Sequence, residues 1–121
     1  MLTASTKLAP VKTFAEFIAR VNAAEGKLSY GSGGVGSLGH LSMALLLARA
    51  GLKMDHVPYQ GGGPAMNDVV AGQLPFYFAN LSEALPHAKT GTISIVAVSS
   101  AARIPQLPEV PTVAESGFPG F

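Results

Sequence analysis

Glycine placement is the feature that most constrains this chain. Nine of the fourteen glycines fall between Gly31 and Gly63, most of them in the clusters Gly31–Gly36 and Gly61–Gly63. Each cluster follows a short strand-forming run and precedes an apolar helical run. A strand, a glycine turn and a helix in that order present unpaired backbone N–H groups and the positive end of the helix. The two clusters therefore favour an α/β fold.

Four helices are expected from caps and apolar spacing. Thr13 and Glu16 form a capping box before apolar residues at i, i+3, i+4 and i+7. One helix is expected to end at Gly51 and the next at Gly72, and Pro64 is expected to be the first residue of the latter helix. The expected helices are 13–26, 37–50, 64–71 and 82–89.

Four strands are expected between these helices, at 28–30, 56–59, 74–79 and 93–98. The run 93–98 is continuously apolar in pattern and is expected to be a central strand with helices on both faces. The tail from Ser99 holds four prolines and is expected to be irregular, with one capped turn at Thr112 and Glu115. Alternating strands and helices predict one α/β domain over residues 1–121, with a mainly parallel sheet and right-handed crossovers.

Composition excludes several partners. Charged residues make up 12% of the 121 residues, the net charge is +1 and no basic run occurs, so nucleic acid and anionic membranes are not expected. The longest apolar run, Met43 to Ala48, is far shorter than a membrane span, and the start of the chain lacks a secretory signal pattern. There is no cysteine, which excludes disulfides and thiolate catalysis.

The first glycine cluster has the chemistry of an anion site. Ser32 and Ser37 add hydroxyl donors to a glycine backbone that a carboxylate or phosphate can approach closely. Gly61 and Asn80 follow the next two expected strands, so three loops are expected to face one pocket at the carboxyl ends of the strands. The simpler alternative is that the glycines only allow each helix to pack close to its strand.

The same cluster also matches a dinucleotide fingerprint, with Gly31, Gly33 and Gly36 at the G-x-G-x-x-G positions. Asp55 lies nineteen residues beyond Gly36, but it precedes the next expected strand, whereas a ribose-binding acid would end it. No Walker lysine and no G-x-S-x-G elbow is present.

The three histidines do not have metal-ligand spacing, so no metal is expected. The anion-site interpretation of the glycine loops also requires no cofactor. His40, in the first turn of the second expected helix, is expected to be structural, with a polar role at the pocket mouth as the alternative. Tyr59 is equally compatible with lining a ligand site and with core packing.

Three segments resemble one known family. The segments Tyr30–Ser37, His56–Ala65 and Leu107–Phe121 resemble, in this order, the Bug (TctC-like) solute-binding receptors of tripartite tricarboxylate transporters. The resemblance covers essentially the whole chain. It implies a type II periplasmic-binding-protein fold, in which two α/β lobes close on a small organic anion.

By this resemblance the chain corresponds to lobe two alone. The expected partners are a small organic carboxylate, the missing first lobe and membrane transporter subunits, with self-association through the exposed lobe face as a further expectation. The parent receptor would be periplasmic, and the chain itself would carry no signal peptide. No catalytic residue is implied, so the chain is not expected to be an enzyme.

The family's ligand loops can be carried over by position. They imply ligand-binding roles for nine residues: Ser32, Gly33, Gly34, Val35, Gly36, Ser37, Tyr59, Gly61 and Asn80. Gln60 departs from the family pattern, where lysine or arginine is common, and this removes a cation near the pocket.

Two hypotheses from other classes remain at this point. One is a dinucleotide-binding fragment of an oxidoreductase, built on the glycine fingerprint. The other is a protein-interaction module that docks a partner through its weakly charged surface.

Overall fold

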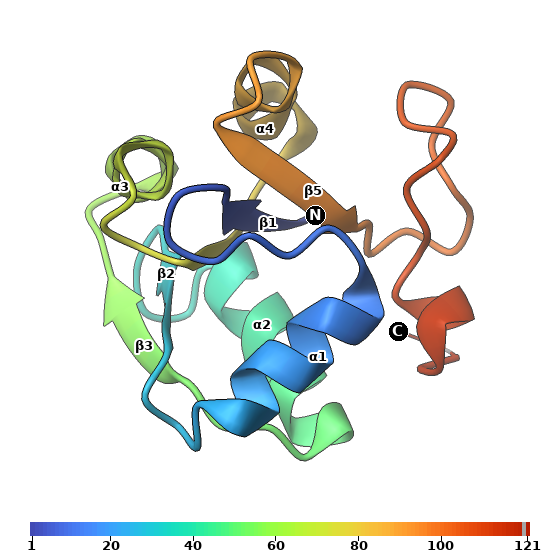
Figure 1. The fold of residues 1–121 in the computed structure, drawn as a ribbon, viewed down its shortest axis with the longest axis horizontal. Helices are drawn as coiled ribbons and strands as arrows, with labels where there is room; N and C mark the ends of the chain where they lie inside the picture. The colour runs from blue at the N-terminus through green and yellow to red at the C-terminus, as the bar shows by residue number, and fades with distance from the viewer. Residues whose placement is uncertain (120) are drawn as a thin grey trace.

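A five-stranded sheet lies between two pairs of helices in the computed structural model, which describes residues 1–119 and 121 (Figure 1). Gly120, part of the third family-like segment, lies outside the described residues. The strands lie side by side in the order β3 (Asp55–Pro58), β2 (Ser29–Ser32), β4 (Phe76–Phe78), β1 (Leu2–Ser5) and β5 (Ile93–Ala97).

The sheet is mixed. Strand β2 is parallel to both β3 and β4, and β1 is antiparallel to its neighbours β4 and β5. Four strands therefore run in one direction, which confirms the expected α/β class with a mainly parallel sheet. Strand β1 was not predicted. Its four residues alternate apolar and polar, but the run is short, and all four are buried in a strand that pairs on both sides.

The expectation that the run 93–98 forms a central strand is wrong. Strand β5 ends at Ala97 and lies at one edge of the sheet. The expected cover on both faces is nevertheless present, since α4 packs on one face of β5 and α1 on the other, and the tail follows its end. Val98 bridges to Thr112, and its N–H donates to the carbonyl of Pro111 at 3.0 Å. The tail thus protects the end of this edge strand.

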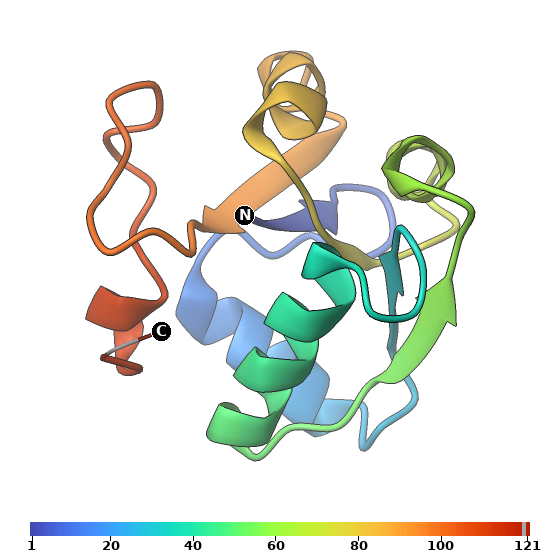
Figure 2. The same cartoon turned by 180° about the vertical axis from the view of Figure 1, so that it is seen from behind.

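Helices α1 (Phe14–Ala23) and α2 (Leu38–Ala50) cover one face of the sheet, and α3 (Gly62–Ala71) and α4 (Leu81–Lys89) cover the other (Figure 2). The capping box of Thr13 and Glu16 is present. Gly51 and Gly72 end α2 and α3 in left-handed conformations. Pro64 is the third residue of α3 and not the first as expected, a position that still requires no N–H donor.

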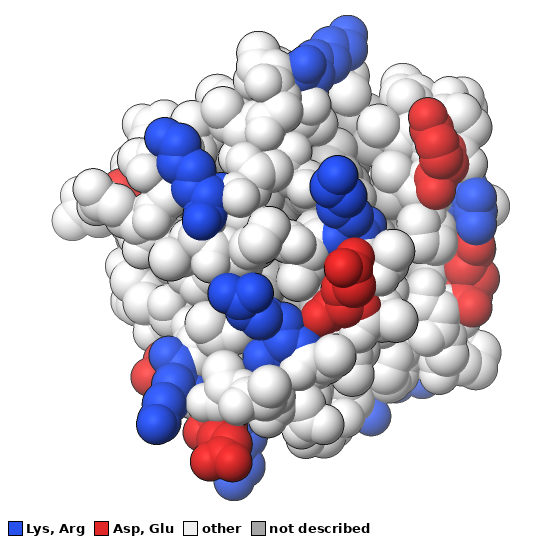
Figure 3. Space-filling model, in the orientation of Figure 1, with Lys and Arg blue, Asp and Glu red and all other residues white. Residues whose placement is uncertain are grey.

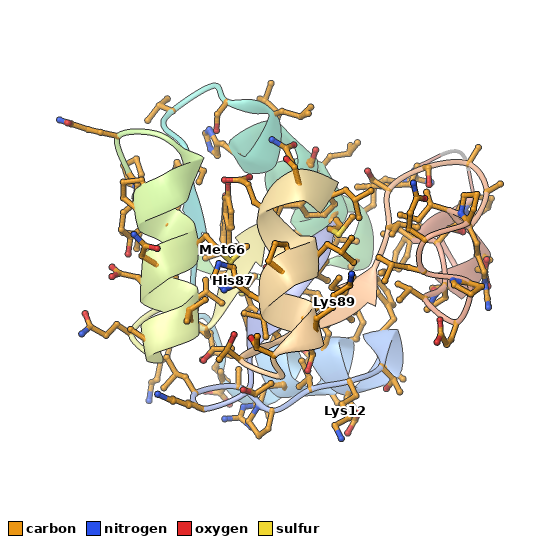
Figure 4. All side chains as sticks on the ribbon, turned by 90° about the horizontal axis from the view of Figure 1, so that it is seen from above. Lys12, Met66, His87 and Lys89 are labelled. Carbon is orange, nitrogen blue, oxygen red and sulfur yellow. The ribbon has the colours of Figure 1, made fainter. Side chains whose placement is uncertain are left out.

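Strand β4 links the two halves of the core. Phe76 and Phe78 belong to the apolar cluster under α1 and α2, whereas Tyr77 belongs to the cluster under α3 and α4. The rings of Phe17 and Phe76 meet edge to face with centroids 5.0 Å apart. Figure 4 shows Met66 and His87 lying between α3 and α4.

The tail is irregular, as predicted, apart from a 3₁₀ turn at Ala114–Ser116. The expected capped turn is confirmed, since the Thr112 hydroxyl accepts from the N–H of Glu115 at 2.9 Å. The tail packs back onto α1 through the rings of Phe118 and Phe14, whose centroids are 5.7 Å apart.

Acidic and basic side chains are interspersed over the face shown in Figure 3, with uncharged surface between them. None of the helices in the described part of the chain is long and apolar enough to cross a membrane.

Candidate functional site

A polar hollow of about 300 Å³ opens where β2 and β4 end. It is lined by residues from the glycine loops, from the first turns of three helices and from the end of β4: Gly33, Ser37, Leu38, Gly39, Gly61, Gly62, Tyr77, Phe78, Asn80 and Glu83. A second hollow of about 210 Å³ adjoins it and shares four of these residues, Leu38, Gly39, Phe78 and Asn80. Ligands in open α/β sheets bind at this edge.

Helices α2, α3 and α4 all begin at this hollow. The first turn of each helix leaves N–H groups without partners inside the helix, and each helix N-terminus carries about half a positive charge. Pro64 removes one of these donors in α3. The helix dipoles therefore favour an anion in the hollow, although no Lys or Arg side chain is among its lining residues and Glu83 adds a carboxylate to them.

The glycines allow the backbone segments around the hollow to approach one another. The N–H of Gly61 donates to the carbonyl of Gly33 at 3.0 Å, which joins the two glycine loops. A Cβ on Gly33 would lie 3.3 Å from the nitrogen of Gly62. A Cβ on Gly39 would lie 2.8 Å from the carbonyl oxygen of Phe78, so only glycine allows α2 to begin so close to β4.

Four of the nine residues carried over from the family line the hollow: Gly33, Ser37, Gly61 and Asn80. Ser37 is the N-cap of α2, and its hydroxyl oxygen accepts from the N–H of His40 at 3.3 Å. The hydroxyl hydrogen of Ser37 therefore remains able to donate to a ligand. Asn80 is exposed and precedes α4.

The other residues of the first glycine loop lie outside the lining. Ser32 is fully buried, and its hydroxyl shares a 2.6 Å hydrogen bond with Nε2 of His56 and accepts from the N–H of Gly34 at 3.1 Å. Val35 is 79% exposed. The N–H of Gly36 donates to Nδ1 of His40 at 3.0 Å. These contacts hold the loop in shape from within.

Tyr59 is directed toward α3. Its hydroxyl donates to Oδ2 of Asp68 at 2.6 Å. Burial, together with this hydrogen bond and the charge of Asp68, raises the pKa of Tyr59 to about 12. The phenol therefore stays protonated and attaches the end of β3 to α3.

Gly62 was expected only as a member of the second glycine cluster, and five lining residues were not singled out from the sequence: Leu38, Gly39, Tyr77, Phe78 and Glu83. Two of them had a signal. Gly39 is an isolated glycine inside a helical pattern, which often indicates close packing. Glu83 follows Asn80 by three residues, the spacing of a capping box, and its Oε1 accepts from the N–H of Asn80 at 3.2 Å. Tyr77 and Phe78 looked like core residues, which they also are.

A larger groove of about 660 Å³ lies between α1 and the tail, with Phe14, Ile18 and Phe118 among its lining residues. Its lining is apolar except for Ser116, and no glycine loop contributes to it, although Phe14 and Ala15 belong to the first turn of α1. It lacks the convergent polar groups that orient a small ligand. The polar hollow is therefore the stronger candidate.

The dinucleotide alternative finds little support in the geometry. Asp55 is the first residue of β3, at the strand end away from the glycine loops. Within residues 1–119 and 121, no three His, Asp or Glu side chains come together in a way that could hold a metal ion.

Comparison with known proteins identifies similar chains. Residues 2–121 match the model of a family described as tripartite tricarboxylate transporter family receptor. The chain is 44% identical over 97 residues to a UPF0065 protein in the tcbD-tcbE intergenic region of Pseudomonas sp. strain P51, covering 79% of this chain and 29% of that protein. It is 34% identical to protein BugT of Bordetella pertussis, covering 86% of this chain and 32% of BugT.

Solved structures agree over the whole chain. An R. palustris protein solved with adipate superposes with a TM-score of 0.94 at 35% identity, covering 100% of this chain and 40% of that one. MatC from Rhodopseudomonas palustris, with bound malate, superposes with a TM-score of 0.91 at 31% identity, covering 100% of this chain and 41% of MatC. The periplasmic binding protein BugD superposes with a TM-score of 0.91 at 29% identity, covering 98% of this chain and 40% of BugD. The chain thus spans about a third of its curated relatives and about 40% of the solved ones.

Proposed function

Because the chain belongs to the tripartite tricarboxylate transporter receptor family, we propose that it forms one lobe of a periplasmic solute receptor and binds a small carboxylated metabolite. Membership confirms the resemblance inferred from the three sequence segments. The family is one of receptors and not of enzymes. Residues 1–121 are proposed to form a single α/β domain that corresponds to the second lobe.

One observation carries this proposal: the two glycine loops and the N-termini of three helices surround a single polar hollow. Backbone N–H groups at helix N-termini are suited to carboxylates. Two structural relatives were solved with small carboxylates, adipate and malate. A dicarboxylic acid of this size suits the volume of the hollow.

Binding would depend on fixed hydrogen bonds. The N–H groups of Gly33 and Gly62 and the hydroxyl of Ser37 would donate to one carboxylate, while the amide of Asn80 would contact the rest of the ligand. The lining residues include no cationic side chain, so attraction comes from helix dipoles. Such a site releases its ligand more readily than a buried ion pair would.

The remaining partners follow from the family. The relatives are two to three times as long, so the proposed receptor would include a first lobe that covers the hollow from the other side. The proposed receiver of the ligand is the membrane part of a tripartite tricarboxylate transporter. The site would act in the periplasm, because the structural relative BugD is a periplasmic binding protein.

Backbone amide NMR tests the proposed site. Titration of the chain with malate or adipate at millimolar concentration is expected to shift the amides of Gly33, Ser37, Gly61 and Gly62, while that of Gly91, at the far end of α4, stays in place. Shifts confined to the apolar groove, or none, would contradict the proposal. Shifts in residues 31–36 with NAD but with neither acid would favour the dinucleotide hypothesis.

A further inference from the structure

A carboxylate of the chain itself lies in the wall of the polar hollow. Oε1 of Glu83 accepts from the hydroxyl of Tyr77 at 3.0 Å and from the N–H of Asn80 at 3.2 Å. The carboxylate lies over Gly62, because a Cβ at that position would clash with Oε2 of Glu83 and with the hydroxyl of Tyr77. Glu83 is thus positioned between the first turns of α3 and α4.

The position of Glu83 is well supported. Tyr77 is 4% exposed, and burial together with the charge of Glu83 raises the pKa of Tyr77, so its hydroxyl remains a donor. Two donors hold Oε1, whereas Oε2 accepts no hydrogen bond within the described part of the chain. An acceptor therefore remains at the hollow.

Glu83 changes what the hollow can bind. It offsets part of the positive potential from the N-termini of α3 and α4. A ligand carboxylate is favoured beside the N-cap Ser37 at the start of α2 and is repelled close to Glu83. A ligand hydroxyl or ammonium group, in contrast, gains a charge-assisted hydrogen bond there.

Resting on the proposed function, we infer that Glu83 is a specificity-determining residue that selects carboxylic acids carrying a hydrogen-bond donor over acids of the same skeleton without one. The shared ligand chemistry is a hydroxyl or ammonium group next to a carboxylate. Succinate, malate and aspartate have the same four-carbon diacid skeleton and differ only in this group, which makes them suitable probes.

The test is an amide NMR titration of the wild-type chain and of Glu83→Gln with each of the three acids, in a buffer free of carboxylates. Glutamine keeps an oxygen acceptor for Tyr77 and Asn80 but removes the charge. Malate and aspartate are expected to bind the wild-type chain at least about threefold more tightly than succinate. In Glu83→Gln, the preference for malate and for aspartate over succinate is expected to shrink, and it is expected to shrink most for aspartate. Glu109→Gln, an exposed change in the tail, is the matched control and is expected to leave the ratios unchanged.

The outcomes separate this inference from the proposed function. If succinate binds the wild-type chain as tightly as malate and aspartate, or if Glu83→Gln leaves the ratios unchanged, the role of Glu83 is overturned while the carboxylate site stands. If no acid shifts the amides of Gly33 or Ser37, both are overturned. The order in which the wild-type chain binds succinate, malate and aspartate still tests the inference if Glu83→Gln does not fold.

Discussion

The imidazole rings of His40 and His56 stack with centroids 3.9 Å apart and planes within 3° of parallel. His40 lies in the first turn of α2, which follows the first glycine loop, and His56 lies in β3, which pairs with the strand before that loop. Nδ1 of His40 accepts from the N–H of Gly36, and Nε2 of His56 bonds to the hydroxyl of Ser32. The stack holds the loop from both of its ends.

This stack predicts a loss of stability at mildly acidic pH. Burial first, and then the charge of His40, lower the pKa of His56 from its ordinary value of 6.5. The unfolded chain therefore binds more protons than the folded chain just below pH 6.5, and stability falls as the pH drops through that value. Thermal unfolding between about pH 7.5 and 5.5 should show this fall, above the range where the carboxylates titrate. Burial lowers the pKa of the Met1 amino group to about 6, so this group contributes in the same range and the comparison of variants isolates the part due to the histidine pair.

The variant His40→Phe keeps an aromatic ring in the stack but removes one of its charges, so its unfolding temperature should depend less on pH over this range. His87→Gln, on α4, is the control and should show the wild-type dependence. Equal pH dependence in His40→Phe and the wild-type chain would contradict a role for the pair.

Gly39→Ala should destabilise the chain although alanine is the better helix former. The new Cβ would lie 2.8 Å from the carbonyl oxygen of Phe78, and main-chain atoms on both sides would have to move apart. We expect a loss of about 1–3 kcal/mol in the free energy of unfolding. Gly63→Ala in α3 is the matched control, since its Cβ meets nothing within 4 Å, and it should gain about 0.4–1 kcal/mol. Urea unfolding of both variants measures the difference.

Tyr59→Phe should lower stability without altering ligand binding. The change removes the hydrogen bond to Asp68 and is expected to cost about 1–2 kcal/mol. Because the hydroxyl is directed at α3, the amide shifts that malate causes at Gly33 and Ser37 should persist. Loss of those shifts in a variant that remains folded would place Tyr59 in the binding site, as the family resemblance implies.

The isolated chain should bind dicarboxylates only weakly. The hollow offers donors from one side, and the chain spans 40% of the relative solved with adipate, so the proposed closure over the ligand needs residues that lie elsewhere in such receptors. We expect affinities weaker than micromolar by calorimetry. Micromolar binding of a dicarboxylate by this chain alone would contradict the two-lobe proposal.

Self-association through α2 is expected at high concentration. Leu38, Leu41 and Leu45 lie on one face of the helix and are 74%, 56% and 50% exposed. Their apolar stripe begins at the hollow, where the proposed first lobe would lie. Sedimentation velocity should detect oligomers, and Leu41→Ser should weaken them. The control Leu8→Ser, in the turn after β1, should leave them unchanged. A monomer at all concentrations would contradict this expectation.

Part of the proposed site was visible in the sequence because the signals for that part are local. Glycine turns, the Ser37 cap and the polar residue Asn80 each depend on neighbours within a few residues, and four of the nine proposed site residues do line one hollow. The sequence could not show that the hydroxyls of Ser32 and Tyr59 have internal partners, because His56 and Asp68 reach them only through the pairing of β2 with β3 and the packing of α3.

The sequence by itself determined the α/β class, the four helices with their caps, and the family, because these depend on residue patterns that continue along the chain. Only the tertiary structure decided the order of the strands, the antiparallel place of β1 between β4 and β5, and the edge place of β5. It also decided that Glu83 lies in the hollow beside Gly62. Strand order and side-chain proximity arise from contacts between distant residues, and no local pattern encodes which distant partner a strand or a carboxylate will meet.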